Sequence, residues 1–283
     1  MKIGVVYPQI ELGGDPQAVR QLGEAVENLG YDHLLAYDHV VGATHDREPK
    51  LWGPYTDTDP FHDPFMMFAY LAGITQKIEF ATGVIILPQR QTALVAKQVA
   101  DLDLLSGERL RFGIGVGWNY VEYEALGQDF STRGARADEQ IELLRRYWSE
   151  PLVTFEGRFD RVDRGNILPR PRRKMPIWIG GFKEAAFRRA GRLGDGFIFV
   201  GDDVTEAWER IDHHLSAAGR PTEGYGRDLI TNTATSVEKC VETVQKWRDR
   251  GGTHASVCTM GMGLTSVTAH IDFIAEVRTR LDA

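Results

Sequence analysis

Short apolar segments alternate with longer amphipathic segments along the whole chain. The apolar segments have the length of buried strands, and the amphipathic segments have the periodicity of helices that cover a sheet. We predict strands at residues 2–7, 32–37, 77–86, 109–116, 176–180, 195–200, 227–234 and 254–259. Helices are expected at residues 15–30, 63–75, 91–106, 136–149, 183–193, 203–219, 237–250 and 267–281. Eight strand–helix units predict a closed (β/α)8 TIM barrel.

Two segments interrupt this repeat. The first, residues 40–62, follows the second strand and is rich in His, Asp, Pro and aromatic residues. Long insertions after barrel strands lie above the mouth where active sites form, so we expect a lid or substrate wall that places Trp52, Tyr55 and His62 in a substrate pocket. These aromatic residues could equally cover the barrel top as core.

The second insertion, residues 150–175, precedes the fifth strand. Alternation around Glu156 and Gly157 suggests a β-hairpin, and a segment rich in Pro and Arg follows it. Because this insertion follows a helix, it could serve packing or dimer contacts.

Bulk properties narrow the class of protein. A chain of 283 residues fits one barrel domain spanning residues 1–283. The formal net charge of −7 disfavours nucleic acid and anionic membrane surfaces as partners. The two cysteines, Cys240 and Cys258, show no CxxC spacing and are interpreted as reduced structural thiols. With no signal-like segment and no apolar run of about 18 residues, a cytoplasmic location is expected.

Asp38 and His39 stand at the end of the second predicted strand, where side chains reach the barrel mouth. A histidine there is suited to proton transfer or to hydrogen bonding with a cofactor ring. The adjacent aspartate could fix the histidine tautomer or a neighbouring backbone turn. The alternative is that Asp38 caps a turn and His39 is an ordinary satisfied polar residue.

Glycines close two other strands. Gly117 and Trp118 end the fourth strand, where a flat ligand could approach the backbone and stack on the indole, although close packing would explain the same residues. Gly180 and Gly181 precede a helix start, where free backbone N–H groups can bind a phosphate, and Gly201 ends the next strand at the same rim. A Gly-Gly pair is also a routine turn.

Other chemistries find little support. His39, His45 and His62 lack HxH or HExxH spacing, so no metal site is expected. There is no GxSxG motif to anchor a serine hydrolase and no GxGxxG motif for a dinucleotide. Redox and lyase chemistry remain open.

Several motifs occur together in a fixed order. They are Asp38-His39, Thr82-Gly83-Val84-Ile85-Ile86-Leu87-Pro88-Gln89-Arg90, Leu105-Ser106-Gly107-Glu108-Arg109, Gly115-Val116-Gly117-Trp118, Arg133-Gly134-Ala135-Arg136 and Pro176-Ile177-Trp178-Ile179-Gly180-Gly181. In order and spacing the chain resembles the luciferase-like monooxygenase superfamily, especially its actinobacterial branch of F420 (deazaflavin)-dependent oxidoreductases.

The resemblance implies a homodimeric barrel with F420 or reduced FMN in its mouth. It places His39, accompanied by Asp38, near the reactive centre of the ring. Cofactor contacts carried over from the family are Thr82, Gly83, Val84, Gly117, Trp118, Gly180 and Gly181. At Thr82, Gly83 and Val84 the family often has a non-prolyl cis peptide or bulge that supports the ring face.

One position departs from the family. Several deazaflavin enzymes place a glutamate proton donor just after the fourth strand, but this chain has Trp118-Asn119, and Glu122 is the first acid available. We expect His39 to transfer the proton; Glu122 is a second candidate, or a solvated helix-start charge. The predicted function is hydride transfer between F420 and a small organic substrate. The alternatives are an FMNH2-dependent monooxygenase using dioxygen, a non-redox lyase, and a non-catalytic flavin-binding barrel.

Overall fold

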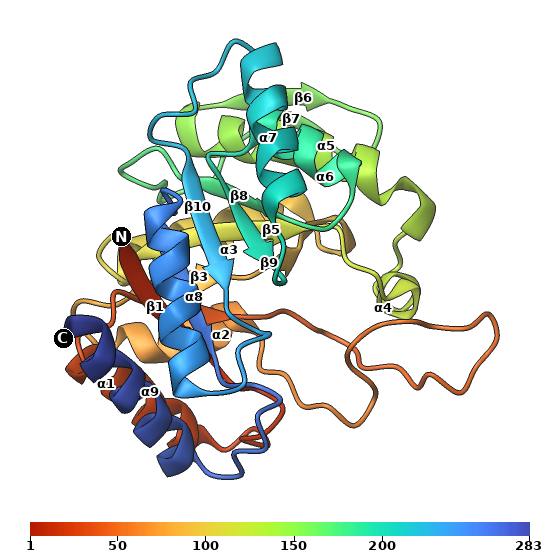
Figure 1. Cartoon of the computed structure of the whole chain (residues 1–283). Helices are drawn as coiled ribbons and strands as arrows, with labels where there is room; N and C mark the ends of the chain where they lie inside the picture. The colour runs from red at the N-terminus through yellow and green to blue at the C-terminus, as the bar shows by residue number, and fades with distance from the viewer.

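The computed structural model describes residues 1–283 and contains one closed parallel barrel (Figure 1). The strand segments are β1 (Lys2–Val6), β2 (His33–Ala36), β3 (Glu79–Thr82), β4 (Ile85–Ile86), β5 (Leu110–Gly115), β8 (Ile177–Gly180), β9 (Gly196–Val200), β10 (Gly226–Ile230) and β11 (His254–Cys258). Neighbouring strands pair in parallel, and pairing of β3 with β5 closes the ring. Because β3 and β4 both pair with β5, they form one interrupted barrel strand, which gives the predicted eight.

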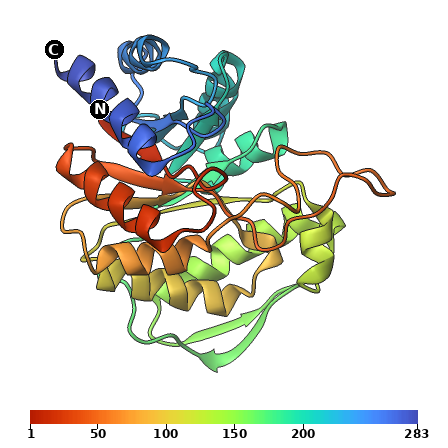
Figure 2. The same ribbon diagram turned by 90° about the horizontal axis from the view of Figure 1, so that it is seen from below.

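Helices surround the barrel (Figures 1 and 2). They are α1 (Pro16–Asn28), α2 (Pro64–Ala72), α3 (Thr92–Leu105), α5 (Arg133–Ser149), α6 (Glu184–Leu193), α7 (Thr205–Ala217), α8 (Val237–Asp249) and α9 (Val267–Asp282). A short helix, α4 (Tyr120–Ala125), and two 3₁₀ turns, η1 (Leu87–Gln89) and η2 (Phe130–Thr132), were not predicted. None of the helices combines the length and apolar character that crossing a membrane requires.

Local sequence explains where two of the helices begin. Asp15 caps α1 by accepting a hydrogen bond from the backbone N–H of Gln17, and Asp63 caps α2 through the N–H of Met66. The next residue in each case is a proline, which suits a first helical turn because that turn leaves its N–H groups without partners. The predicted starts of these two helices are therefore confirmed.

The barrel interior has two layers of different character. Near the mouth it is apolar, with a cluster made of Val6, Leu35, Ala81, Trp178, Ile198, Ile230 and Cys258. Near the strand starts it is charged: Arg111 donates to Asp228 at 2.6 Å and to Glu79 at 2.7 Å. The third and fourth barrel strands are otherwise mostly apolar, and the charges of Glu79 and Arg111 are tolerated there because they pair.

The two insertions differ in structure. Residues 150–175 contain the antiparallel hairpin of β6 (Val153–Glu156) and β7 (Arg161–Gly165), which confirms the predicted hairpin; Figure 2 shows it beyond the helical layer. Residues 40–62 contain no helix or strand and project from the end of β2 alongside α4 (Figure 1). The first insertion thus lies on the side of the barrel where the strands end.

Candidate active site at the barrel mouth

Asp38 is 3% exposed and directs its carboxylate toward the interrupted strand. It accepts hydrogen bonds from the backbone N–H of Ile86 at 2.9 Å and from Arg90 at 2.7 Å. Arg90 also donates to Asp63 at 3.1 Å. Burial alone would lower the pKa of Arg90, but the Asp38 and Asp63 carboxylates together outweigh burial and raise it. Of the two roles predicted for Asp38, the geometry matches the one in which it fixes a backbone turn.

His39 is held instead by Glu122. Its Nδ1 lies 3.4 Å from Oε2 of Glu122, while Oε1 accepts hydrogen bonds from the backbone N–H groups of Val40 (2.6 Å) and Val41 (3.0 Å). Glu122 lies in α4 and is 1% exposed. The interpretation of Glu122 as a solvated charge was therefore wrong, because α4 folds back beneath the start of the 40–62 loop.

Asn119, the residue that precedes α4, strengthens this arrangement. Asn119 caps α4 by accepting from the N–H groups of Val121 and Glu122, and its amide donates to the carbonyl of Val41 at 3.1 Å. Both ends of the Asn119 amide therefore hold the chain next to His39. Sequence reasoning missed Asn119, although an Asn three residues before an acid is a recognisable helix start.

The two nitrogens of the His39 ring differ in their surroundings. Nδ1 faces the Glu122 carboxylate, an acceptor, which favours the tautomer with the proton on Nδ1. Nε2 forms no hydrogen bond within the protein. A histidine oriented in this way can accept or return a proton at Nε2 while the carboxylate stabilises the charged ring.

Aromatic rings surround His39. The ring centroid of Phe61 lies 4.8 Å away, that of Tyr55 5.3 Å and that of Trp118 5.5 Å. Gly53 packs closely against Trp118, because a Cβ atom at Gly53 would lie 2.3 Å from the indole. The 40–62 loop and the end of β5 thus meet around the imidazole and form an aromatic wall.

The other predicted pocket residues lie elsewhere. Trp52 is 71% exposed, and the ammonium of Lys50 lies 4.1 Å from its ring centroid. His62 packs edge-on against Tyr7 with ring centroids 6.5 Å apart. The structure therefore brings Tyr55 to His39 but does not bring Trp52 or His62 into contact with it.

The interruption of the third barrel strand places Val84 in the barrel opening. The peptide bond between Gly83 and Val84 is cis, which confirms the expected feature at this position. A Cβ atom at Gly115 would lie 2.5 Å from Val84, and one at Gly180 would lie 2.8 Å from it. Both glycines are thus required to make room for the isopropyl group.

Thr82 and Gly117 support the same region from the barrel wall. The Thr82 hydroxyl donates to the carbonyl of Gly113 at 2.7 Å and accepts from its N–H at 2.8 Å. This buried hydroxyl therefore has its hydrogen-bond partners within the barrel wall. Gly117 has φ of +63°, and a Cβ there would lie 2.8 Å from Ile86. Gly117 is half-buried, so its backbone can be reached from the mouth, whereas Thr82 is fully buried.

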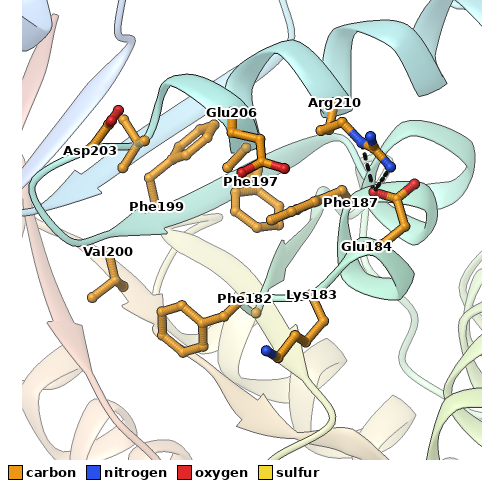
Figure 3. Close-up of a pocket in the computed structure, with 13 residues that line it drawn as sticks. Phe182, Lys183, Glu184, Phe187, Phe197, Phe199, Val200, Asp203, Glu206 and Arg210 are labelled. Atoms are coloured by element: carbon orange, nitrogen blue, oxygen red, sulfur yellow. Dashed lines mark hydrogen bonds and ion pairs between the residues drawn. The ribbon is translucent and has the colours of Figure 1, made fainter.

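A cavity of about 390 Å³ opens beside Gly181, between α6 and α7 (Figure 3). Its apolar wall includes Phe187, Phe197 and Phe199. At its edge Arg210 pairs with Glu184 at 2.8 Å, while the exposed ammonium of Lys183 forms no ion pair. Lys183 is the N-cap of α6, so the first N–H groups of the helix point toward this rim.

The three rim glycines are not equivalent. Gly181 lines the cavity, whereas Gly180 lies against Val84. Gly201 has φ of +108°, and a Cβ atom there would meet no other atom within 4 Å, so it forms an open turn after β9. Of the three glycines predicted to bind a phosphate, only Gly181 lines the cavity at the start of α6.

Comparison with known proteins finds relatives, one of which is named for its activity. An uncharacterized protein of Mycobacterium tuberculosis is 34% identical over 211 residues, 73% of this chain and 72% of that protein. An F420-dependent glucose-6-phosphate dehydrogenase of Intrasporangium calvum is 31% identical over 215 residues, 71% of this chain and 60% of that protein.

Solved structures share the fold at low identity. A monooxygenase, RslO1, from Streptomyces bottropensis has a TM-score of 0.80 and 20% identity, with both chains fully covered. An F420-dependent secondary alcohol dehydrogenase, solved with an F420-acetone adduct, has a TM-score of 0.80 and 15% identity over 99% of each chain. At these identities the likeness concerns the fold.

The family model described as luciferase-like monooxygenase matches residues 1–254. This match covers most of the chain and agrees with the closed barrel and with the cis peptide after β3. The chain therefore belongs to the luciferase-like monooxygenase family and is an oxidoreductase of that family.

Proposed function

We propose that this protein transfers a hydride between coenzyme F420 and a small organic substrate, with His39 moving the accompanying proton. The observation that carries the proposal is the imidazole at the barrel mouth, with Nδ1 beside Glu122 and Nε2 without a protein partner. The relatives named as F420-dependent dehydrogenases support the choice of cofactor.

The residues at the mouth fit a flat cofactor that carries a phosphate. Val84 offers an apolar surface in the opening, since Gly115 and Gly180 leave room for its side chain. The start of α6 next to Gly181 offers free N–H groups and the positive end of the helix dipole to a phosphate, and Lys183 adds a cation. When bound, the deazaflavin or flavin ring supplies the redox chemistry.

The protein's own part in the reaction is binding and proton transfer. In the oxidation of an alcohol, Nε2 of His39 takes the hydroxyl proton as the hydride leaves the adjoining carbon. Glu122 stabilises the imidazolium and keeps the ring in place. Tyr55, Phe61 and Trp118 exclude water from this step and favour a substrate with an apolar body.

The same mouth would suit an FMNH2-dependent monooxygenase, since a flavin has the same flat ring and phosphate. The fold shared with the Streptomyces bottropensis monooxygenase is compatible with that alternative. The homodimer expected from the resemblance stays a prediction, which light scattering of the purified protein checks.

Fluorescence titration of the apo-protein with F420 and with FMN tests the proposal. Saturable binding of F420, with weaker binding of FMN, is the expected result. The variant Gly181→Val should weaken F420 binding at least tenfold, because a side chain would face Ala186 and the helix start. Gly219→Val, at the end of α7, is the control for backbone strain. No saturable binding of either cofactor would overturn the proposal.

Turnover separates the remaining functions. If F420 binds and is reduced by an alcohol in anaerobic buffer, the dehydrogenase function is supported. If only FMN binds and substrate oxidation requires dioxygen, the monooxygenase alternative replaces it. Binding of either cofactor without any turnover over a panel of alcohols and aldehydes would favour the non-catalytic barrel.

A further inference from the structure

A second cavity, of about 450 Å³, lies on the face of the barrel opposite the mouth. It is bounded by the last turn of α5 and by the segment that leads into β8, where the strand begins. Its lining residues are Arg145, Trp148, Ser149, Pro171, Arg172, Arg173, Lys174 and Met175. None of the residues proposed for the active site contributes to it.

This cavity is strongly cationic in an acidic protein. Four of its eight lining residues carry a positive charge and none carries a negative charge. The segment 170–174 reads Arg-Pro-Arg-Arg-Lys, whereas the whole chain has a formal net charge of −7. Concentrated positive charge in a concave surface raises the local concentration of anions.

Two carboxylates hold the cavity's cations in place without closing it. Asp103 accepts a hydrogen bond from Arg173 at 2.6 Å, and Asp195 accepts one from Arg145 at 2.9 Å. Asp195 also accepts from the N–H of Ile177 at 3.0 Å, and Lys174 lies 3.4 Å from it. Neither carboxylate lines the cavity, so two of the guanidinium groups are fixed from outside it before any ligand arrives.

Several donors remain available to a ligand. The Nη1 atom of Arg173 and the Nε and Nη1 atoms of Arg145 form no hydrogen bond within the protein, and neither does any nitrogen of Arg172. These nitrogen atoms have no partner in the protein and are not among its buried unpaired atoms, so they are exposed to solvent. Planar guanidinium groups with free N–H pairs match the geometry of phosphate oxygens.

Two of the other lining residues are large, apolar and firmly packed. Trp148 is 7% exposed and donates its indole N–H to the carbonyl of Ala96 at 3.0 Å, and Met175 is 1% exposed. The cavity volume lies in the range of small-molecule sites, which run from about 300 to 1,000 Å³. A nucleic acid backbone would need an extended basic surface rather than a confined hollow.

We propose that this cavity is a binding site for a small phosphate-bearing anion, separate from the cofactor site. Arg172 and Lys174 would contact the phosphate together with the fixed Arg145 and Arg173, and Trp148 and Met175 would adjoin the apolar part of the ligand. This proposal does not depend on the identity of the cofactor, because the cavity lies on the other face of the barrel.

Calorimetric titration with pyrophosphate at constant ionic strength tests the proposal. We expect saturable binding at one site per chain, weakened at least tenfold in the double variant Arg172→Ala/Lys174→Ala. Neither side chain belongs to the buried core, so the fold should persist. The control Arg164→Ala/Lys246→Ala removes two exposed cations elsewhere and should bind pyrophosphate as the wild type does.

The cofactor site needs its own control, because it too is proposed to hold a phosphate. Gly181→Val should leave pyrophosphate affinity unchanged if the anion binds opposite the mouth. Absence of saturable binding, or equal affinity in Arg172→Ala/Lys174→Ala and wild type, would overturn the proposal. So would tighter binding of a single-stranded oligonucleotide that displaces pyrophosphate, since that result would identify a nucleic acid surface.

Discussion

The carboxylate of Glu122 lies 3.4 Å from Nδ1 of His39, and its other oxygen binds the two backbone N–H groups that follow the histidine. This single buried side chain therefore links α4, the start of the 40–62 loop and the proposed proton-transfer group. With both oxygens engaged, Glu122 is suited to position His39 rather than to deliver a proton to substrate itself.

Replacing Glu122 should affect turnover more than cofactor binding. In Glu122→Gln the amide can still accept from Val40 and Val41, but its NH2 group would face Nδ1 of His39 and favour the wrong tautomer. We expect kcat to fall about 10- to 100-fold, with F420 affinity changed less than about twofold and the pH profile of kcat/KM displaced.

Glu124→Gln is the matched control, because Glu124 is exposed on the same short helix. It should leave kcat and the pH profile unchanged. His39→Asn should reduce kcat about 10²- to 10⁴-fold. If Glu122→Gln lowered only thermal stability and kept the wild-type pH profile, Glu122 would have a structural role alone.

The ion pair of Asp38 with Arg90 should contribute to stability more than to chemistry. Asp38→Asn leaves the guanidinium of Arg90, 13% exposed, without its buried partner, and we expect a loss of about 3 kcal/mol in the free energy of unfolding. Asp63→Asn removes a partner that is 33% exposed and should cost about 1 kcal/mol or less. Urea unfolding of the two variants measures both effects; equal losses would contradict the different burial of the two carboxylates.

The contact of Val84 with Gly180 permits a test by compensation. Gly180→Ala would place a Cβ 2.8 Å from Val84, and overpacking of this kind costs about 1 to 3 kcal/mol. In the double variant Gly180→Ala/Val84→Ala the space returns, so we expect part of the stability to be recovered. A double-mutant cycle by chemical unfolding gives the coupling energy, and additive effects would show that the two side chains do not compete for this space.

Sequence reasoning could locate the barrel and the mouth because those depend on repeated local patterns. The position of His39 followed from its place directly after a strand. Glu122 could not be assigned in the same way, since nothing local indicates that α4 folds back onto residues 40 and 41. Phe61 and Tyr55 were recognisable as aromatic residues of a loop, but it is the loop's conformation that brings both of them to His39 and leaves Trp52 exposed.

The charged layer inside the barrel was hidden for a related reason. Arg111 and Glu79 occur in otherwise apolar segments, and Asp228 is 117 residues from Arg111 in the chain. Only the closed barrel brings these three charges together, so their pairing is a property of topology and not of any segment. The same layer holds two histidines, His33 and His254, which make stability depend on pH.

Burial, together with the nearby positive charge of Arg111, lowers the pKa of His254 to about 4. Burial and Arg111 also hold the pKa of His33 well below its usual range. Both histidines are therefore neutral in the folded protein near pH 6, whereas in the unfolded chain they ionise near pH ~6.5. Because the unfolded chain binds more protons below about pH 6.5, the free energy of unfolding should decrease as the pH falls from about 6.5 toward 4.

Each histidine contributes a slope of up to about 1.4 kcal/mol per pH unit in this window. Urea unfolding at pH 7, 6 and 5 measures the slope. His254→Asn should reduce the slope by up to about 1.4 kcal/mol per pH unit, because one proton fewer is taken up on unfolding. His213→Asn, on the outer helix α7, is the control and should keep the wild-type slope. Stability that stayed constant between pH 7 and pH 5 would mean that water or a rearrangement inside the barrel lets these histidines ionise in the folded state, and the charged layer would then be less tightly closed than its contacts indicate.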